Sequence, residues 1–158
     1  MPTSSDTQRI AEICGSSHSS KYTRGRRGNV AAVARIASSP LSRSAASAEA
    51  SLADAEANGL TIETVIETHF HADFLSGHLG LVEQLGADIV YGAAAAGRTE
   101  FPINALADGS VIALGDPTRG VTLEIMATPG HTPESICVLV REGGVDSAPY
   151  AVLTGDTL

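Results

Sequence analysis

The chain has 158 residues, of which 43% are hydrophobic and 18% charged, so its length and composition fit one globular domain rather than a disordered chain. Two cysteines are too few for a disulfide scaffold, and no apolar run approaches the roughly 20 residues that span a bilayer. The net charge of −8 is divided unequally, because residues 1–50 carry seven basic and three acidic side chains and the remainder carries three basic and fifteen acidic ones. We expect a cytoplasmic protein whose composition changes near residue 50.

The N-terminal segment, residues 1–48, is rich in Ser and Arg and has little hydrophobic periodicity. We expect a flexible arm or a segment that is not native to the fold, with one short helix over 29–37 bounded by Pro40. The basic patch Arg24–Gly28 lacks the interleaved aromatic residues of a nucleic-acid surface, so we predict no nucleic-acid partner. The patterned domain is expected to cover 49–158.

From residue 48 onwards, helical and β-branched segments alternate. Gly59 and Gly86 are placed to end helices, Asp108-Gly109 is a turn signal, and 93–96 is a connector or short helix. Helices are expected at 48–58 and 75–85, and strands at 60–68, 88–91, 111–114, 121–127, 135–141 and 150–154. This order predicts a layered α/β sandwich. Because the chain stops directly after its last strand, we expect structure to be missing at the C-terminal end.

The segment from Thr68 to His78 carries three histidines and an aspartate where a predicted strand ends, a place where ligands commonly bind in α/β proteins. His69 and His71 are two residues apart, so an extended backbone directs both side chains to one side, and Asp73 continues that side. Imidazole and carboxylate groups are ligands for Zn²⁺ or non-haem Fe²⁺. A structural turn of hydrogen-bonded histidines is the alternative, and the density of such residues argues against it.

Two later turns each carry one further candidate ligand. His131 lies in the turn over 128–135, where prolines restrict φ and Gly130 permits close approach of the backbone. Asp156 follows the last apolar strand in a Gly-Asp turn. Alone, His131 would more often be a structural histidine and Asp156 a turn former or helix N-cap. The three motifs in this order together predict a metal site.

These motifs, T-H-F-H-A-D-F, P-G-H-T and T-G-D-T-L, resemble those of the metallo-β-lactamase superfamily, over roughly residues 50–158. The longer stretches E-T-H-F-H-A-D-F-L-S-G-H and P-G-H-T-P-E-S look most like the persulfide dioxygenase branch, which is related to glyoxalase II and includes rhodanese-fused bacterial members. The resemblance implies an α/β fold, an αββα metallo-β-lactamase-type sandwich that is incomplete at both ends. It also implies a mononuclear non-haem iron dioxygenase that uses O₂ to oxidise glutathione persulfide, or a similar low-molecular-weight persulfide, to sulfite.

One position departs from the two-metal members of that superfamily. They carry a metal-binding histidine directly after the aspartate of the first motif, whereas this chain has Phe74. A phenyl ring has no lone pair to donate, and His78 falls inside the predicted helix and is a poor substitute. We therefore predict one Fe²⁺ per chain, with Zn²⁺ as the alternative metal.

With one metal, the resemblance assigns the ligands to His69, His131 and Asp156. Two histidines and one carboxylate leave three coordination positions open, which is enough for O₂ and a substrate sulfur. In the same assignment His71 and Asp73 contact the metal ligands rather than the metal. They orient these ligands and move protons.

Two other functions stay open at this stage. One is a glyoxalase II-like thiolester hydrolase, in which a metal-bound hydroxide attacks the thioester carbonyl. The other is an inactive, truncated metallo-β-lactamase-fold remnant. The expected partners are a small-molecule thiol persulfide and O₂, a rhodanese partner or fused domain, and a second copy of the chain that covers an open sheet edge. No membrane partner is expected.

Overall fold

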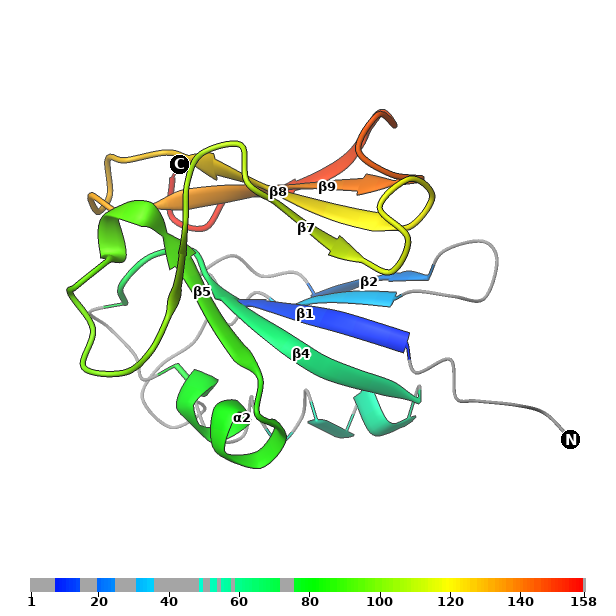
Figure 1. The fold of residues 1–158 in the computed structure, drawn as a ribbon, viewed down its shortest axis with the longest axis horizontal. Helices are drawn as coiled ribbons and strands as arrows, with labels where there is room; N and C mark the ends of the chain where they lie inside the picture. The colour runs from blue at the N-terminus through cyan, green and yellow to red at the C-terminus, as the bar shows by residue number, and fades with distance from the viewer. Residues whose placement is uncertain are drawn as a thin grey trace, which may run out of the picture.

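The computed structural model describes residues 8–14, 20–24, 31–35, 49, 52–53, 55–57, 59–71 and 76–157 (Figure 1). The first sheet contains β1 (Gln8–Cys14), β4 (Leu60–Glu67), β5 (Asp88–Gly92) and β6 (Asn104–Leu106), in the spatial order β1-β4-β5-β6. The second sheet contains β7 (Val111–Leu114), β8 (Val121–Ala127), β9 (Ile136–Glu142) and β10 (Pro149–Leu153), in the order β10-β9-β8-β7. A separate hairpin pairs β2 (Ser20–Arg24) with β3 (Ala31–Arg35).

β4 is one of the two inner strands of the first sheet, in which neighbouring strands run parallel. Its β-branched residues form the core of the sheet, since Ile62 and Val65 are at most 1% exposed. Helix α2 (His78–Leu85) packs beside this sheet, on the side away from the second sheet (Figure 1), and buries Leu81 against the same cluster. The helix ends at Gly86, whose φ of 69° allows its N–H to donate to the carbonyl oxygen of Val82.

The main core lies between the two sheets, which face each other in Figure 1. The first sheet contributes Ile66 and Val90, and the antiparallel second sheet contributes Leu123, Ile125 and Val138. All five side chains are at most 3% exposed. Aliphatic residues build this core without any tryptophan, because the chain has none.

Most of the predicted elements are confirmed, and together they form the expected α/β sandwich. Each of the six predicted strands is present, with ends that differ by at most one residue from the prediction. The connector is a short 3-10 helix, η1 (Ala93–Ala95). Helical backbone at 52–53 and 55–57 precedes Gly59, whose φ is 65°. The predicted start of the second helix at 75 lies outside the described residues, because 72–75 are not described.

The short helix predicted over 29–37 is wrong, because β3 forms there and pairs antiparallel with β2. The alanines of this segment favour a helix locally, but that preference is weak and the hydrogen bonds of a hairpin override it. Strand β6 was not predicted either, since three residues are too few for a periodic pattern. It exists because β5 offers an open edge for parallel pairing.

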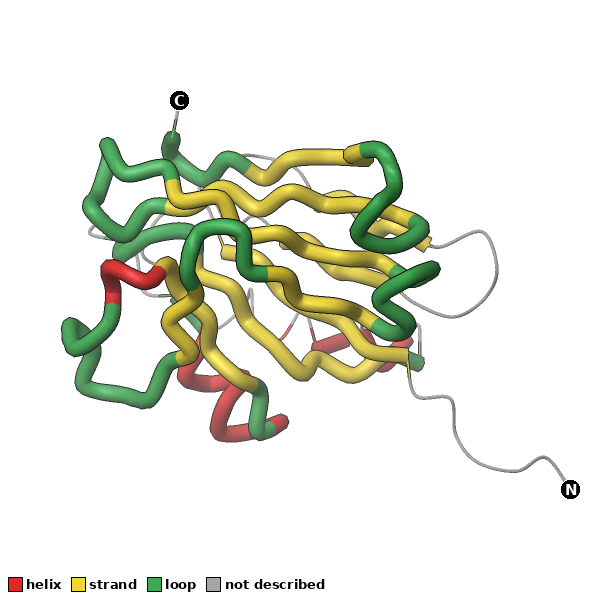
Figure 2. The backbone as a smooth tube through the Cα atoms, turned by 45° about the horizontal axis from the view of Figure 1, so that its top comes forward, coloured by secondary structure: helices red, strands yellow, loops and turns green. Residues whose placement is uncertain are grey.

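Strand β1 places residues from the N-terminal segment in the first sheet, paired with β4. The boundary near residue 48, and the origin of the segment before it, stay predictions. Figure 2 shows the α-helical segments on one side of the sandwich, beside the first sheet. None of the helices in the described part of the chain is long and apolar enough to cross a bilayer.

Candidate metal centre

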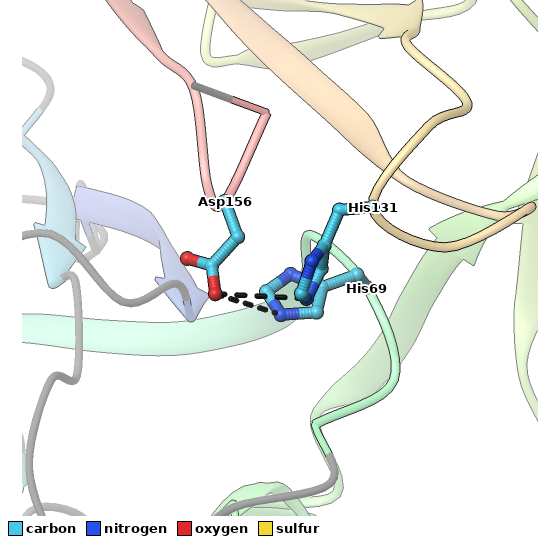
Figure 3. Close-up of side chains that lie close together, drawn as sticks. All are labelled: His69, His131 and Asp156. Carbon is cyan, nitrogen blue, oxygen red and sulfur yellow. Dashed lines mark ion pairs between the residues drawn. The ribbon is translucent and has the colours of Figure 1, made fainter.

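Three predicted side chains from three separate turns converge at one end of the two sheets. His69 follows β4 of the first sheet, and His131 follows β8 of the second. Asp156 lies in the turn after β10. Figure 3 shows the two imidazoles and the carboxylate pointing toward one another. β4 and β8 are anchored in the core by buried residues, and β10 packs on it through the partly buried Ala151 and Leu153, so each strand helps to position the turn that follows it.

The distances in this group suit a shared ion better than direct hydrogen bonds. Asp156 Oδ2 lies 3.6 Å from His69 Nε2 and 3.7 Å from His131 Nε2. Both separations exceed the range of a good hydrogen bond. One ligand atom from each residue lies within 4.8 Å of the others, and the two imidazole rings stand edge to face with centroids 4.9 Å apart. The atoms therefore surround a common point without satisfying one another.

The surroundings of His69 favour the neutral imidazole, which is the form that can bind a metal through a ring nitrogen. It is 2% exposed, and its Nδ1 lies 3.0 Å from the Thr68 hydroxyl. When Nδ1–H donates to that hydroxyl, the Nε2 that faces Asp156 carries the lone pair. Burial lowers the pKa of His69, and the nearby His131 lowers it further, whereas the Asp156 charge acts in the opposite direction. The net effect favours the unprotonated imidazole that a metal requires.

Asp156 is held against His69 through the preceding glycine. Gly155 has a φ of 54°, and a Cβ at this position would lie 2.7 Å from Thr68 Oγ1. Only glycine combines that conformation with such a close approach. The other carboxylate oxygen, Asp156 Oδ1, is buried and has no hydrogen-bond partner within the described residues. An unsatisfied buried oxygen beside two imidazole nitrogens fits a cation, so the donor set is compatible with Zn²⁺ or Fe²⁺.

The turn that carries His131 is held by its own polar side chains. The Thr128 N–H donates to the Ser135 carbonyl over 2.9 Å, and the Thr132 N–H donates to Ser135 Oγ over 3.1 Å. The close approach predicted at Gly130 is wrong, because nothing lies within 4 Å of a Cβ built there. His131 itself is about half exposed, with 47% of its side-chain area accessible. The site is thus open to solvent on the His131 side and closed on the His69 side.

His71 lies beside this group without belonging to it. Its ring centroid is 4.1 Å from that of His69, and its Nε2 lies 3.6 Å from Glu67 Oε2. Its side chain is only 3% exposed. Asp73, the other residue expected behind the ligands, lies outside the described residues, as does Phe74. The structure therefore places His71 next to a candidate ligand and leaves Asp73 as a prediction.

Glu67 anchors a second polar cluster that the sequence alone did not point to. It is fully buried, accepts a short hydrogen bond from Ser76 Oγ and lies 3.0 Å from His78 Nδ1. Burial acts to raise the pKa of Glu67, but His78, Ser76 and His71 outweigh that effect and lower it, so the carboxylate stays charged. The available signal was an acidic residue directly after the apolar pair Val65-Ile66, at the end of a strand predicted to be buried.

Glu134 and Arg98 were also missed. Glu134 is 2% exposed; its Oε1 accepts the Phe70 N–H, and its Oε2 pairs with Arg98 at 2.6 Å. Burial acts to raise the pKa of Glu134, but the Phe70 N–H, the Thr132 hydroxyl and Arg98 outweigh it and lower the pKa. The sequence placed Glu134 in a turn next to His131 and held no sign of its partners, which lie in other segments.

Comparison with known proteins identifies the family of the chain. A family model described as the metallo-beta-lactamase superfamily matches residues 39–158. A hydroxyacylglutathione hydrolase of Acidiphilium cryptum is 35% identical over 113 residues, which cover 72% of this chain and 42% of the relative. A hydroxyacylglutathione hydrolase of Nitrosococcus oceani is 31% identical and covers 68% of this chain and 38% of its own. The chain thus spans about two fifths of the length of these relatives.

Two solved structures have the same architecture. A metallo-beta-lactamase from Staphylococcus aureus subsp. aureus COL superposes with a TM-score of 0.60 and 32% identity, over 74% of this chain and 33% of that chain. ETHE1 from Myxococcus xanthus superposes with a TM-score of 0.53 and 25% identity, over 64% of this chain and 40% of its own.

Proposed function

This chain belongs to the metallo-beta-lactamase superfamily, as its three motifs predicted, and from that premise we propose that His69, His131 and Asp156 bind one metal ion. The proposal rests on the convergence of three donor atoms within 4.8 Å, from turns that are distant in the sequence. No other group of three such residues within that distance occurs in the described part of the chain. The metal is held by this chain's own side chains from both sheets.

The surroundings of the group favour a single ion. The Nε2 of His71 lies 3.6 Å from Glu67 Oε2, so it faces a carboxylate of the protein. In the sequence, Phe74 stands where two-metal members of the superfamily carry a ligand, and phenylalanine offers no lone pair. A second ion would therefore lack the donor that the two-metal members have at this position.

We further propose that the metal is Fe²⁺ and that the reaction is persulfide oxidation. Two histidines and one carboxylate are the donor set of many non-haem Fe²⁺ oxygenases, and they leave open positions for two further molecules. When bound, Fe²⁺ supplies redox chemistry toward O₂ and a Lewis acid for the terminal sulfur. In the balanced reaction a persulfide, O₂ and water form a thiol, sulfite and two protons, and the terminal sulfur gives up the electrons that reduce O₂.

The chain's own residues have defined parts in this proposal. Thr68 holds the tautomer of His69, and Gly155 brings Asp156 close enough to share the ion. Glu67 orients His71, whose buried ring lies against His69 and is placed to take or return a proton. His131 lies at the exposed side, where substrate enters. The thiol-binding residues and a rhodanese partner stay predictions, as do the homo-oligomer and the cytoplasmic location.

The test is to reconstitute the purified chain with Fe²⁺ under nitrogen, count the metal and then add glutathione persulfide and O₂. We expect about one Fe per chain, O₂ uptake and sulfite formation. His131→Ala is the matched control, because it removes one donor from the open side of the site. Metal binding without O₂ uptake would contradict the dioxygenase and leave the metal site intact. A chain that binds no metal would contradict both and favour the inactive remnant.

A thiolester hydrolase is the second candidate, and the names of the relatives favour it. Hydroxyacylglutathione hydrolases match the chain at 31–35% identity in several bacteria. In that case the ion would be Zn²⁺, whose bound water ionises near pH 7. Steady hydrolysis of S-lactoylglutathione by the Zn²⁺-loaded chain, with no O₂ uptake by the Fe²⁺-loaded chain, would establish the hydrolase instead.

A further inference from the structure

We infer that Glu134 is a positioning residue that locks the His69 turn and the His131 turn at a fixed spacing and so sets the geometry of the metal site. This inference rests on the proposed metal site. Glu134 belongs to the turn of His131, three residues further along the chain. Its carboxylate contacts the other histidine turn, because Oε1 accepts the N–H of Phe70, the residue after His69.

Two hydrogen bonds, one on each side of His69 in the chain, link the His69 turn to the residues that follow His131. The Ile136 N–H donates to the Thr68 carbonyl over 2.9 Å and joins the start of β9 to the end of β4. The bond from Phe70 N–H to Glu134 Oε1, at 2.9 Å, adds a second point on the far side of His69. Two hydrogen bonds restrict the orientation of one turn against the other more than one bond does.

The backbone of Glu134 is itself immobilised against β5. A Cβ built on Gly92 would lie 2.6 Å from the Glu134 carbonyl oxygen and 2.7 Å from Ile136 Cγ2. The end of β5 and the His131 turn are therefore in close contact. Because the backbone of Glu134 is closely packed, the hydrogen bond from its carboxylate to Phe70 restricts where the His69 turn can lie relative to the His131 turn.

Arg98 holds the other oxygen of the same carboxylate. Its Nη1 lies 2.6 Å from Glu134 Oε2, and its guanidinium carbon lies 4.8 Å from the centre of the Phe70 ring. The carboxylate is buried while the arginine side chain is 46% exposed. Arg98 thus compensates a buried charge and at the same time covers the residue whose N–H that charge accepts.

This arrangement requires a carboxylate and not merely a side chain of the same size. In Glu134→Gln the amide has one oxygen and one NH₂ group, whereas the Phe70 N–H and the Arg98 guanidinium, which hold the two separate oxygens of Glu134, are both donors that cannot accept. Either orientation of the amide leaves one donor facing another donor. Removing the guanidinium in Arg98→Ala frees the amide to turn its oxygen toward Phe70. The Gln variant should therefore recover in that background.

The experiment titrates the metal-free chain with Co²⁺ and records its visible d–d absorption, which reports the arrangement of the ligands. We expect Glu134→Ala to weaken Co²⁺ binding by about 10–100-fold and to change the spectrum. Glu134→Gln should lose affinity as well, and the double variant Glu134→Gln/Arg98→Ala should regain part of the loss. The matched control is Glu124→Gln, which breaks an ion pair of 2.9 Å with Arg141 within the second sheet. It should leave affinity and spectrum unchanged.

The outcomes separate this inference from the metal site. A wild-type chain that binds no Co²⁺ overturns the site itself. If the wild-type chain binds Co²⁺, and Glu134→Ala and Glu134→Gln bind it with the same affinity and spectrum as the wild type, the positioning role is overturned. If Glu134→Ala does not fold, the Gln variant and the double variant decide, because they keep the volume of the side chain. Equal effects of Glu134→Gln and Glu124→Gln would also overturn the inference, since loss of any ion pair would then suffice.

Discussion

At the scale of single residues, each polar group of the candidate site has few possible hydrogen-bond partners. His69 is buried with one nitrogen bonded to Thr68, so its other nitrogen can only face Asp156. Asp156 keeps one buried oxygen without a partner in the described part of the chain. Buried polar groups that lack partners are costly unless a ligand satisfies them. The site thus has the chemistry of a centre that is completed by an ion.

Removing His131 should affect metal binding far more than removing His71. In His131→Ala two donors remain, and they should hold Fe²⁺ or Zn²⁺ poorly, so we expect most of the metal to be lost. In His71→Ala all three donors remain, and we expect much of the metal to be retained while activity falls by about 10–100-fold. Elemental analysis of metal per chain measures the difference. Comparable loss in both variants would mean that His71 is itself a ligand.

Gly155→Ala should destabilise the fold more than an alanine at another glycine of positive φ. Gly59 has a φ of 65° but open space around it, so Gly59→Ala should cost only the backbone term of about 1–2 kcal/mol. At Gly155 the added methyl also meets Thr68, which should add about 1–3 kcal/mol. Gly130→Ala, in open space, is the neutral control. Urea denaturation gives the free energies of unfolding, and equal values for residues 155 and 59 would contradict the close contact.

At the scale of elements, the strands place the donors and one helix supports the strands. Each donor follows a strand that packs on the core, through buried residues in β4 and β8 and through partly buried ones in β10, so the polar turn after it has restricted freedom. Helix α2 covers β4 from outside the sandwich, with Leu81 packed against Val65 and its neighbours. A change that weakens the packing of α2 should therefore disturb β4 and, through it, the position of the His69 turn.

Leu81→Ala should destabilise the chain by about 2–5 kcal/mol, because Leu81 is 1% exposed and its removal leaves a cavity beside β4. Leu79 is the matched control on the same helix, since it is 46% exposed. Leu79→Ala should change the free energy of unfolding by less than about 0.5 kcal/mol. Thermal or urea unfolding measures both, and similar losses would show that α2 is not packed through Leu81.

At the scale of the whole molecule, the site joins the two sheets. His69 comes from the first sheet, and His131 and Asp156 come from the second, so an ion bound by all three would connect the layers. The contacts of Glu134 and Gly155 connect the same turns within the protein. Metal binding and the stability of the sandwich should accordingly be coupled.

Zn²⁺ or Fe²⁺ at about 100 times its dissociation constant should stabilise the folded chain by about 2.7 kcal/mol. For a chain of this size that raises the melting temperature by about 5–10 °C. A chelator should reverse the shift, and His131→Ala should abolish it. Differential scanning fluorimetry measures all three conditions, and an equal shift in the His131 variant would remove that residue from the site.

The sequence by itself determined six of the strands, in chain order, and the three turns that carry the candidate ligands. β-Branched runs at Leu60–Glu67 and Val121–Ala127 need a buried sheet, and their periodicity is local, so it can be read from neighbouring residues. The donor motifs were equally legible, because His69, His131 and Asp156 each lie at the end of such a strand. These features depend on residues that are close along the chain.

Only the tertiary structure decided what depends on distant partners. The segment 31–35 became a strand because a hairpin partner outweighs the weak helical preference of its alanines. Glu67 and Glu134 became charged, buried anchors because His78 and Arg98 reach them from other elements. The order of these residues along the chain does not show which of them lie close together in space. A carboxylate that is a solvated surface group in sequence terms is a positioning group only where the fold surrounds it with donors.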